Sequence, residues 1–180
     1  MVRNSAFQPS RWAKKLNVKP QTTPVMLDTI TSPQHDAQSG RTMVLVDIEN
    51  FCQMPNPSVE AIEKAQTLLE TLIRIKAGDQ MIIACDVNNI ANVGFTWRGN
   101  FELRMGQGKD GADLELLEEL ENGQLADRFE NVIVVSGDHI YAPSLRILEA
   151  QGVNTRVISH SANISAELYI SCKNTQIVYA

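Results

Sequence analysis

The amino-acid sequence predicts a three-layer α/β domain, with a mainly parallel central sheet of about five strands flanked by helices. Short apolar runs, partly β-branched, recur from residue 43 onward, as in strands that are buried on both faces. Segments with the apolar spacing of helices separate these runs, and such alternation builds parallel sheets with right-handed crossovers. The chain has 180 residues, of which 43% are hydrophobic and 21% charged, and this composition fits one globular domain.

Three strands and one helix are expected in the first half of the domain. The first strand ends in Asp47, and the second ends in Asp86. Between them, Ser58 has the side chain of an N-cap, and apolar residues then keep helical spacing until Gly78 ends the segment. The third apolar run is weaker. The three strands are expected at residues 43–46, 81–85 and 101–105.

The second half should add two strands and two helices, followed by two shorter elements. Asp113 is expected to open a helix that Gly123 closes. Pro143 suits the first turn of the next helix, which runs to Gly152. The remaining elements are strands at residues 132–135 and 155–158, a short helix at 166–172 and a final strand at 176–179.

Residues 1–41 are expected to form a flexible basic N-terminal arm, which leaves residues 42–180 as the folded domain. The arm is rich in Ser, Thr, Gln, Pro and Asn and has few periodic apolar residues. It carries six Lys or Arg and two acids, whereas the remainder carries ten Lys or Arg and nineteen acids. A basic arm on an acidic body is a common layout for a metal-dependent enzyme that acts on a polyanion, although a solubilising tail has the same composition.

The composition excludes several classes of protein. Three cysteines without a paired spacing argue against a disulfide framework and against a CxxC zinc site. No run reaches the roughly 18 apolar residues of a membrane span. The N-terminus lacks the apolar segment of a secretory signal. We therefore expect a cytoplasmic protein with no membrane partner.

Carboxylates follow the expected strands at the points where these end. Asp47, Asp86 and Asp138 each come directly after a strand, and Asp113 starts the helix after the third strand. Each alone has a structural explanation, such as an N-cap or a turn. Because the carboxyl ends of parallel strands share one edge, all four should face one rim. Clustered carboxylates repel until a proton or a cation intervenes, and an all-oxygen site suits Mg²⁺ or Mn²⁺.

Three segments carry a resemblance to a known family. Residues 47–50 read Asp-Ile-Glu-Asn, residues 109–113 read Lys-Asp-Gly-Ala-Asp, and residues 135–138 read Val-Ser-Gly-Asp, followed by Tyr141 and Pro143. They resemble, in the same order, the D-x-E-N, K-G-x-D and S-G-D-x-D-F-x-P motifs of NYN domains, with one residue inserted in the second. NYN domains belong to the PIN-like nuclease superfamily.

The resemblance implies a Rossmann-like, PIN-like sheet and metal-dependent cleavage of single-stranded RNA. Carried over by position, Asp47, Asp113 and Asp138 would bind the metal, and Asn50 would position a water or phosphate. Asp110 is a further candidate ligand, because the second Asp of the S-G-D-x-D motif is Ile140 here. That departure leaves open a single-ion site, or a domain that binds RNA without cutting it. A homodimer or a protein partner also stays open.

Basic and small residues supply candidate contacts to RNA. Residues 106–111 fit the G-x-G-x-x-G pattern of nucleotide-binding loops, but they follow the third strand rather than the first, and two aspartates at the helix start would repel a pyrophosphate. In the favoured interpretation these glycines let the backbone approach a phosphate chain. Trp97, beside arginines, could stack a base or cover the core. The candidate substrate contacts are Lys109, Ser136, Arg98 and Arg104.

Overall fold

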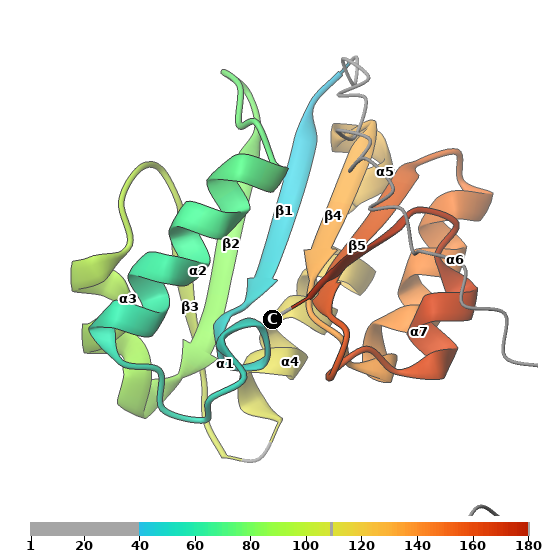
Figure 1. Ribbon diagram of the computed structural model, residues 1–180. Helices are drawn as coiled ribbons and strands as arrows, with labels where there is room; N and C mark the ends of the chain where they lie inside the picture. The colour runs from blue at the N-terminus through green and yellow to red at the C-terminus, as the bar shows by residue number, and fades with distance from the viewer. Residues whose placement is uncertain (1–39, 109, 180) are drawn as a thin grey trace, which may run out of the picture. The chain divides into compact units, whose positions relative to one another are not determined.

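Within residues 40–108 and 110–179, which the computed structural model describes, the chain forms a six-stranded sheet in which all neighbours are parallel. The strand order is β3-β2-β1-β4-β5-β6 (Figure 1). The expected parallel sheet is confirmed, and the C-terminal segment adds the sixth strand. The strands are β1 (Thr42–Asp47), β2 (Gln80–Asp86), β3 (Glu102–Gly106), β4 (Asn131–Val135), β5 (Asn154–His160) and β6 (Thr175–Val178).

Helices cover both faces of this sheet, and together the three layers confirm the predicted architecture (Figure 1). Two short 3-10 turns, η1 (Val87–Asn89) and η2 (His139–Tyr141), follow β2 and β4. One face carries α1 (Ile48–Cys52), α2 (Val59–Leu72) and α3 (Ile90–Thr96), and the other carries α4 (Gly111–Asn122), α5 (Leu125–Arg128), α6 (Ala142–Ala150) and α7 (Ala166–Ser171).

Each face of the sheet has its own apolar core, because successive side chains of a strand point to opposite faces. In β1, Met43 and Leu45 join the core under α4 and α6, whereas Val44 and Val46 join the core under α2. All six residues of β1 are buried. This two-sided burial explains why the strands are continuous apolar runs rather than alternating ones.

The strand order creates a crevice between β1 and β4. The chain leaves β1 toward β2 and β3 on one side, and β4, β5 and β6 continue on the other side. Ligands of open parallel sheets bind at such a point, outside the carboxyl ends of the strands. Asp47 ends β1 here, and Ser136 directly follows β4. Among the described residues, no helix is long and apolar enough to cross a membrane.

The structure differs from the expected elements mainly in short helices. The α1, α3 and α5 helices were not predicted, because α1 and α5 have at most five residues and α3 contains β-branched residues and Gly94, which have low helix propensity. The helix that was expected at residues 114–122, with Asp113 at its start, begins three residues earlier. The α4 helix begins at Gly111, and Asp110 occupies its N-cap position with a left-handed φ of 59°.

Candidate functional site

Asp47 is a buried carboxylate at the end of the central strand β1. Its side chain is the N-cap of α1, where Oδ1 accepts a hydrogen bond of 3.0 Å from the Asn50 backbone N–H. Its Oδ2 accepts a second one of 3.1 Å from the Ser136 hydroxyl, at the end of β4. Only 4% of Asp47 is exposed. The side chain is therefore fixed at the crevice between β1 and β4.

Asp138 lies beside this pair at the more exposed side of the crevice. Its backbone N–H donates to the Ser136 hydroxyl at 3.2 Å, and its Oδ1 accepts from the Ile140 backbone at 2.9 Å. The exposed His139 ring also lies 2.9 Å from Asp138 Oδ1, through Nδ1. The Asp138 side chain is 35% exposed, so it can meet solvent and an incoming ligand.

Asp113 reaches the same crevice from the first turn of α4. Its Oδ1 accepts a hydrogen bond of 2.7 Å from the hydroxyl of Tyr141, which is fully buried in η2. Its carboxyl group also forms a hydrogen bond with the carboxyl group of Asp47. Two acids that lie this close share a proton or a cation, because two full negative charges would repel each other.

The proton affinities of these groups reflect burial and mutual repulsion. Burial raises the pKa of Asp47 well above its usual value, and the charge of Asp113 raises it further. Burial also raises the pKa of Asp113, although the hydrogen bonds from Tyr141 and Asp47 act in the opposite direction. The pKa of the Tyr141 hydroxyl is raised by burial and by the nearby charges of Asp47, Asp113 and Asp138. All three carboxylates therefore act on one hydroxyl.

An open cleft of about 500 Å³ leads to Asp47 and Asp113. Its described lining contains five carboxylate residues and three asparagines but no Lys or Arg. Oxygen ligands of this kind suit a hard divalent cation such as Mg²⁺ or Mn²⁺. The five carboxylate residues are Asp47, Glu49, Asp86, Asp110 and Asp113.

The fit to such an ion rests on the pair Asp47 and Asp113. Among the described residues, no group of three or more His, Cys, Asp or Glu side chains is arranged to hold a metal ion. The expected convergence of three aspartates is thus present as a contacting pair, with Asp138 close enough to affect the pKa of Asp113. The donor chemistry fits a cation, and the described lining of the cleft places no cationic side chain beside the pair.

Several other carboxylates of the cleft form hydrogen bonds that stabilise the neighbouring elements. Glu49 Oε1 accepts hydrogen bonds from the Asp86 backbone at 3.0 Å and from the Asn89 amide at 2.6 Å, so it fixes the end of β2. Asp86 caps η1 through Asn88. Asp110 is exposed and makes no side-chain capping bond. Asp110, the further candidate ligand predicted from the sequence, is therefore less engaged in structural hydrogen bonds than Glu49 and Asp86.

Asn50 and Ser136 form hydrogen bonds that connect the elements around the site. Asn50 Oδ1 accepts from the Gly137 backbone at 3.0 Å, and Asn50 O accepts from the Asn163 amide at 2.9 Å. These bonds tie α1 to the loops after β4 and β5. Ser136 is completely buried, and its hydroxyl bridges Asp47 and Asp138. The structure thus places Ser136 behind the carboxylates, which corrects the expectation that it contacts substrate.

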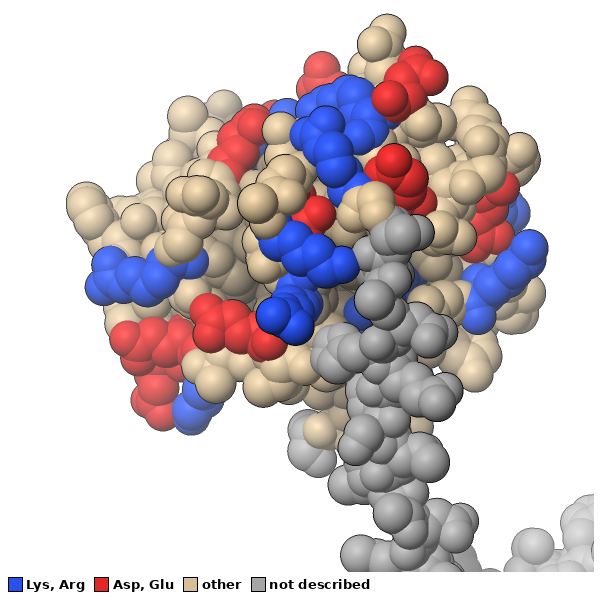
Figure 2. Space-filling model, turned by 90° about the horizontal axis from the view of Figure 1, so that it is seen from above, with Lys and Arg blue, Asp and Glu red and all other residues tan. Residues whose placement is uncertain are grey.

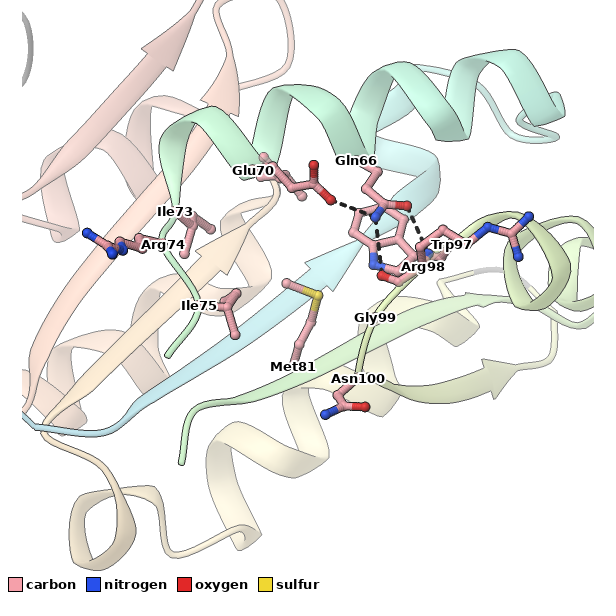
Figure 3. Close-up of a pocket in the computed structure, with 11 residues that line it drawn as sticks. Gln66, Glu70, Ile73, Arg74, Ile75, Met81, Trp97, Arg98, Gly99 and Asn100 are labelled. Atoms are coloured by element: carbon pink, nitrogen blue, oxygen red, sulfur yellow. Dashed lines mark hydrogen bonds between the residues drawn. The ribbon is translucent and has the colours of Figure 1, made fainter. Parts of the chain in front are cut away.

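Arg98 lies at the other edge of the sheet, which corrects its predicted place in the site. It precedes β3, so it stands where the strands begin, in a separate pocket of about 340 Å³ beside α2 (Figure 3). The Gln66 side chain holds its backbone, accepting from Arg98 N at 2.9 Å and donating to Arg98 O at 3.2 Å. Trp97 is buried there, so it covers the core.

Arg104 is also unavailable to a ligand at the crevice. Its guanidinium forms ion pairs of 2.7 Å with Glu102 and with Glu119 on α4, and its side chain is only 23% exposed. These pairs neutralise its charge beside α4. Lys109, the remaining predicted phosphate contact, lies outside the described residues, as does most of the expected N-terminal arm.

The glycine loop is explained by close packing of backbone against backbone. A Cβ atom on Gly106 would lie 1.9 Å from the carbonyl carbon of Gly111, so β3 and the first turn of α4 can touch only without side chains. Gly108 has a φ of +81°. The described glycines of the motif thus serve the packing of the fold, and Asp110 and Asp113 place carboxylates at the helix start, where they would repel an anion.

The contact of the Tyr141 hydroxyl with Asp113 was not predicted from the sequence. The signal was present, because Tyr141 stands where the S-G-D-x-D-F-x-P motif has Phe. Its contact with Asp113 joins residues 28 positions apart and depends on the packing of η2 against α4. Sequence spacing does not reveal such a contact.

Comparisons with known proteins agree with this architecture. A family model described as the NYN domain matches residues 41–178. No match is found among curated proteins. Among solved structures, a protein of unknown function from Vibrio parahaemolyticus is similar, with a TM-score of 0.50 and 14% identity over 77% of this chain and 92% of that chain. At this identity the similarity concerns the fold alone.

Proposed function

This chain belongs to the NYN domain family, which has the PIN-like nuclease fold, and we propose that it is a metal-dependent ribonuclease that hydrolyses phosphodiester bonds in single-stranded RNA. The observation that carries the proposal is the contact between the buried carboxyl group of Asp47 and the half-buried carboxyl group of Asp113 in the crevice between β1 and β4. A buried pair of acids is costly to keep charged, and a divalent cation removes that cost.

Three aspartates would hold the ion, and each would do so differently. Asp47 is fixed by Asn50 and Ser136, so it would be the rigid ligand. Asp113 would lose the proton that it shares with Asp47 when the ion binds. Asp138 is more exposed and would meet the substrate side. A bound Mg²⁺ or Mn²⁺ supplies an activated water and neutralises charge on the phosphate.

The charge distribution makes RNA binding at the crevice depend on the cation. The described lining of the cleft has five carboxylate residues and no Lys or Arg, so every charged side chain that a phosphate would meet there is negative. Lys and Arg gather with acids on the opposite edge, where the strands begin (Figure 2). There Arg41 and Arg128 lie over the Phe129 ring at 4.9 and 5.0 Å. We propose that the ion, Lys109 and the arm offset the repulsion.

Cleavage of a labelled single-stranded RNA tests the proposal. The full chain should cut it with Mg²⁺ or Mn²⁺, and EDTA should stop the reaction. Asp138→Asn should abolish cutting while the protein still folds, because it keeps the size of the side chain and removes its charge. Asp127→Asn, an exposed aspartate of α5 outside the cleft, is the matched control and should cut like wild type. Wild-type protein that never cuts with either metal would refute the proposal.

A second candidate is a domain of the same fold that binds RNA without cutting it. The observation that favours it is Ile140, which packs against the core where the family motif has an aspartate. This candidate predicts RNA binding in the presence of Mn²⁺ and no cleavage. Ile140→Asp distinguishes the two, because it should create activity only if the missing carboxylate limits catalysis.

A further inference from the structure

The hydroxyl of Tyr141 is buried among the three aspartates of the crevice. It donates a hydrogen bond of 2.7 Å to Asp113 Oδ1, while the ring of Tyr141 packs in the core beneath α4 and α6. The residue is 0% exposed, so solvent does not compete for this bond. The same Asp113 carboxyl group contacts the carboxyl group of Asp47. The Tyr141 hydroxyl therefore contacts one member of this pair of acids.

We propose that Tyr141 is a positioning residue for the metal centre. By donating to Oδ1 of Asp113, its hydroxyl restrains the rotation of that carboxyl group and would leave the other oxygen free to hold an ion. A donor of this kind orients a metal ligand and also favours its charged form, and loss of such a donor typically weakens metal affinity 10- to 100-fold. The inference rests on the proposed metal site and does not need RNA cleavage.

At two adjacent positions the chain differs from the family motif, and one of them loses a polar group whereas the other gains one. Ile140 removes a carboxylate from the motif, and Tyr141 adds a hydroxyl where the motif has Phe. A Phe ring could occupy the same place in the core, but Asp113 Oδ1 would then lose its 2.7 Å donor. With one carboxylate fewer, the orientation of the remaining ligands matters more for holding an ion.

The positions of the neighbouring side chains support a role toward the ion rather than in general stability. Asp47 already has two fixed donors, Asn50 N–H and the Ser136 hydroxyl. Asp113 lies in the first turn of α4, and the Tyr141 hydroxyl donates the hydrogen bond that orients its carboxyl group. The bond from Tyr141 ties this carboxyl group to the loop that carries Asp138.

Titration of the full chain with Mn²⁺ in the absence of RNA tests the proposal. Tyr141→Phe should raise the dissociation constant about tenfold or more by calorimetry. Tyr169→Phe, which removes the hydroxyl of a tyrosine that is 54% exposed, should leave it unchanged. Mn²⁺ should also change the near-ultraviolet tyrosine spectrum of the wild type, and this change should be lost in Tyr141→Phe alone.

A destabilised control variant distinguishes a role of Tyr141 in metal binding from a role in stability alone. Leu148→Ala removes a buried side chain of α6 and should lower the melting temperature in EDTA without weakening Mn²⁺ binding. Tyr141→Phe that binds Mn²⁺ within twofold of wild type overturns the proposal, as does wild-type protein that binds no Mn²⁺. Wild-type protein that binds Mn²⁺ tightly but does not cut RNA contradicts the ribonuclease and leaves the role of Tyr141 intact.

Discussion

The hydroxyl of Ser136 donates a 3.1 Å hydrogen bond to Oδ2 of Asp47 and so joins the carboxyl ends of β4 and β1. Ser136 is 0% exposed and Asp47 is 4% exposed. The bond fixes a carboxylate at the crevice where the strand order reverses. With Asp113 in contact and the described cleft lining free of Lys and Arg, a proton or a cation has to relieve the repulsion between these two carboxyl groups.

Replacing Asp47 by Asn should stabilise the metal-free protein. Asn keeps an oxygen for the Asn50 N–H and relieves the repulsion with Asp113. We expect a higher melting temperature in EDTA at neutral pH, with about 2–4 °C for each kcal/mol gained. In saturating Mn²⁺ the order should reverse, because only the wild type gains the binding free energy.

The difference in stability between Asp47→Asn and the wild type in EDTA should depend on pH. Because the pKa of Asp47 is raised in the folded protein, its protonated form favours folding, and that stability is lost as pH rises through the raised pKa. The advantage of Asp47→Asn in EDTA should therefore be small near pH 4 and grow toward pH 8. Thermal melts of both proteins at several pH values measure it. An advantage that is constant with pH would contradict the raised pKa.

Neither arginine predicted to touch RNA should contribute to RNA affinity. Arg98→Ala should leave binding within about twofold, because Arg98 lies where the strands begin. Arg104→Ala should lower the melting temperature by breaking the pair with Glu119, yet leave binding unchanged. Lys109→Ala should weaken binding and lower the salt slope by about one. Fluorescence anisotropy at several salt concentrations distinguishes these outcomes.

The N-terminal arm should add affinity through its charge. Deleting residues 1–39 removes five Lys or Arg and should weaken RNA binding and flatten its salt dependence. Arg41 is kept, because its Nε donates to Gly78 O at 2.9 Å within the fold. A full-length variant with those five residues changed to Gln is the matched control and should behave like the deletion. Equal affinity and salt slope in all three proteins would make the arm a passive tail.

The glycine loop gives a test of the fold itself. Gly106→Ala would force a Cβ to within 1.9 Å of Gly111, so we expect a loss above about 3 kcal/mol in the free energy of unfolding. Gly108→Ala meets no atom within 4 Å and should cost only about 1 kcal/mol through its positive φ. Urea denaturation compares the two. Equal losses would show that close packing between β3 and α4 is unimportant.

The sheet was predictable from the sequence because its strands are buried on both faces and stand out as apolar runs. The sequence also predicted which edge of the sheet carries the aspartates, because they directly follow those runs. Short helices were not predictable, and missing α3 caused the error at Arg98. This helix carries the chain from the end of β2 back to the edge where β3 begins, so the segment before β3 lies far along the strands from Asp86.

The contact between Asp47 and Asp113 required knowledge of the packing. The two residues come from β1 and from the helix after β3, and the order of the strands cannot be read from apolar runs. The hydrogen bond from Tyr141 to Asp113 depends in addition on one side-chain rotamer. The sequence motifs indicated candidate residues, and the packing of the elements decides which of them touch.

We propose that a divalent ion held at Asp47 and Asp113 drives RNA cleavage. Anomalous diffraction from crystals soaked in Mn²⁺ tests the site directly. We predict a peak between these two carboxyl groups, on the side that faces Asp138, and no peak in crystals of Asp47→Asn. A peak elsewhere, or none in protein that cuts RNA with Mn²⁺, would contradict the site.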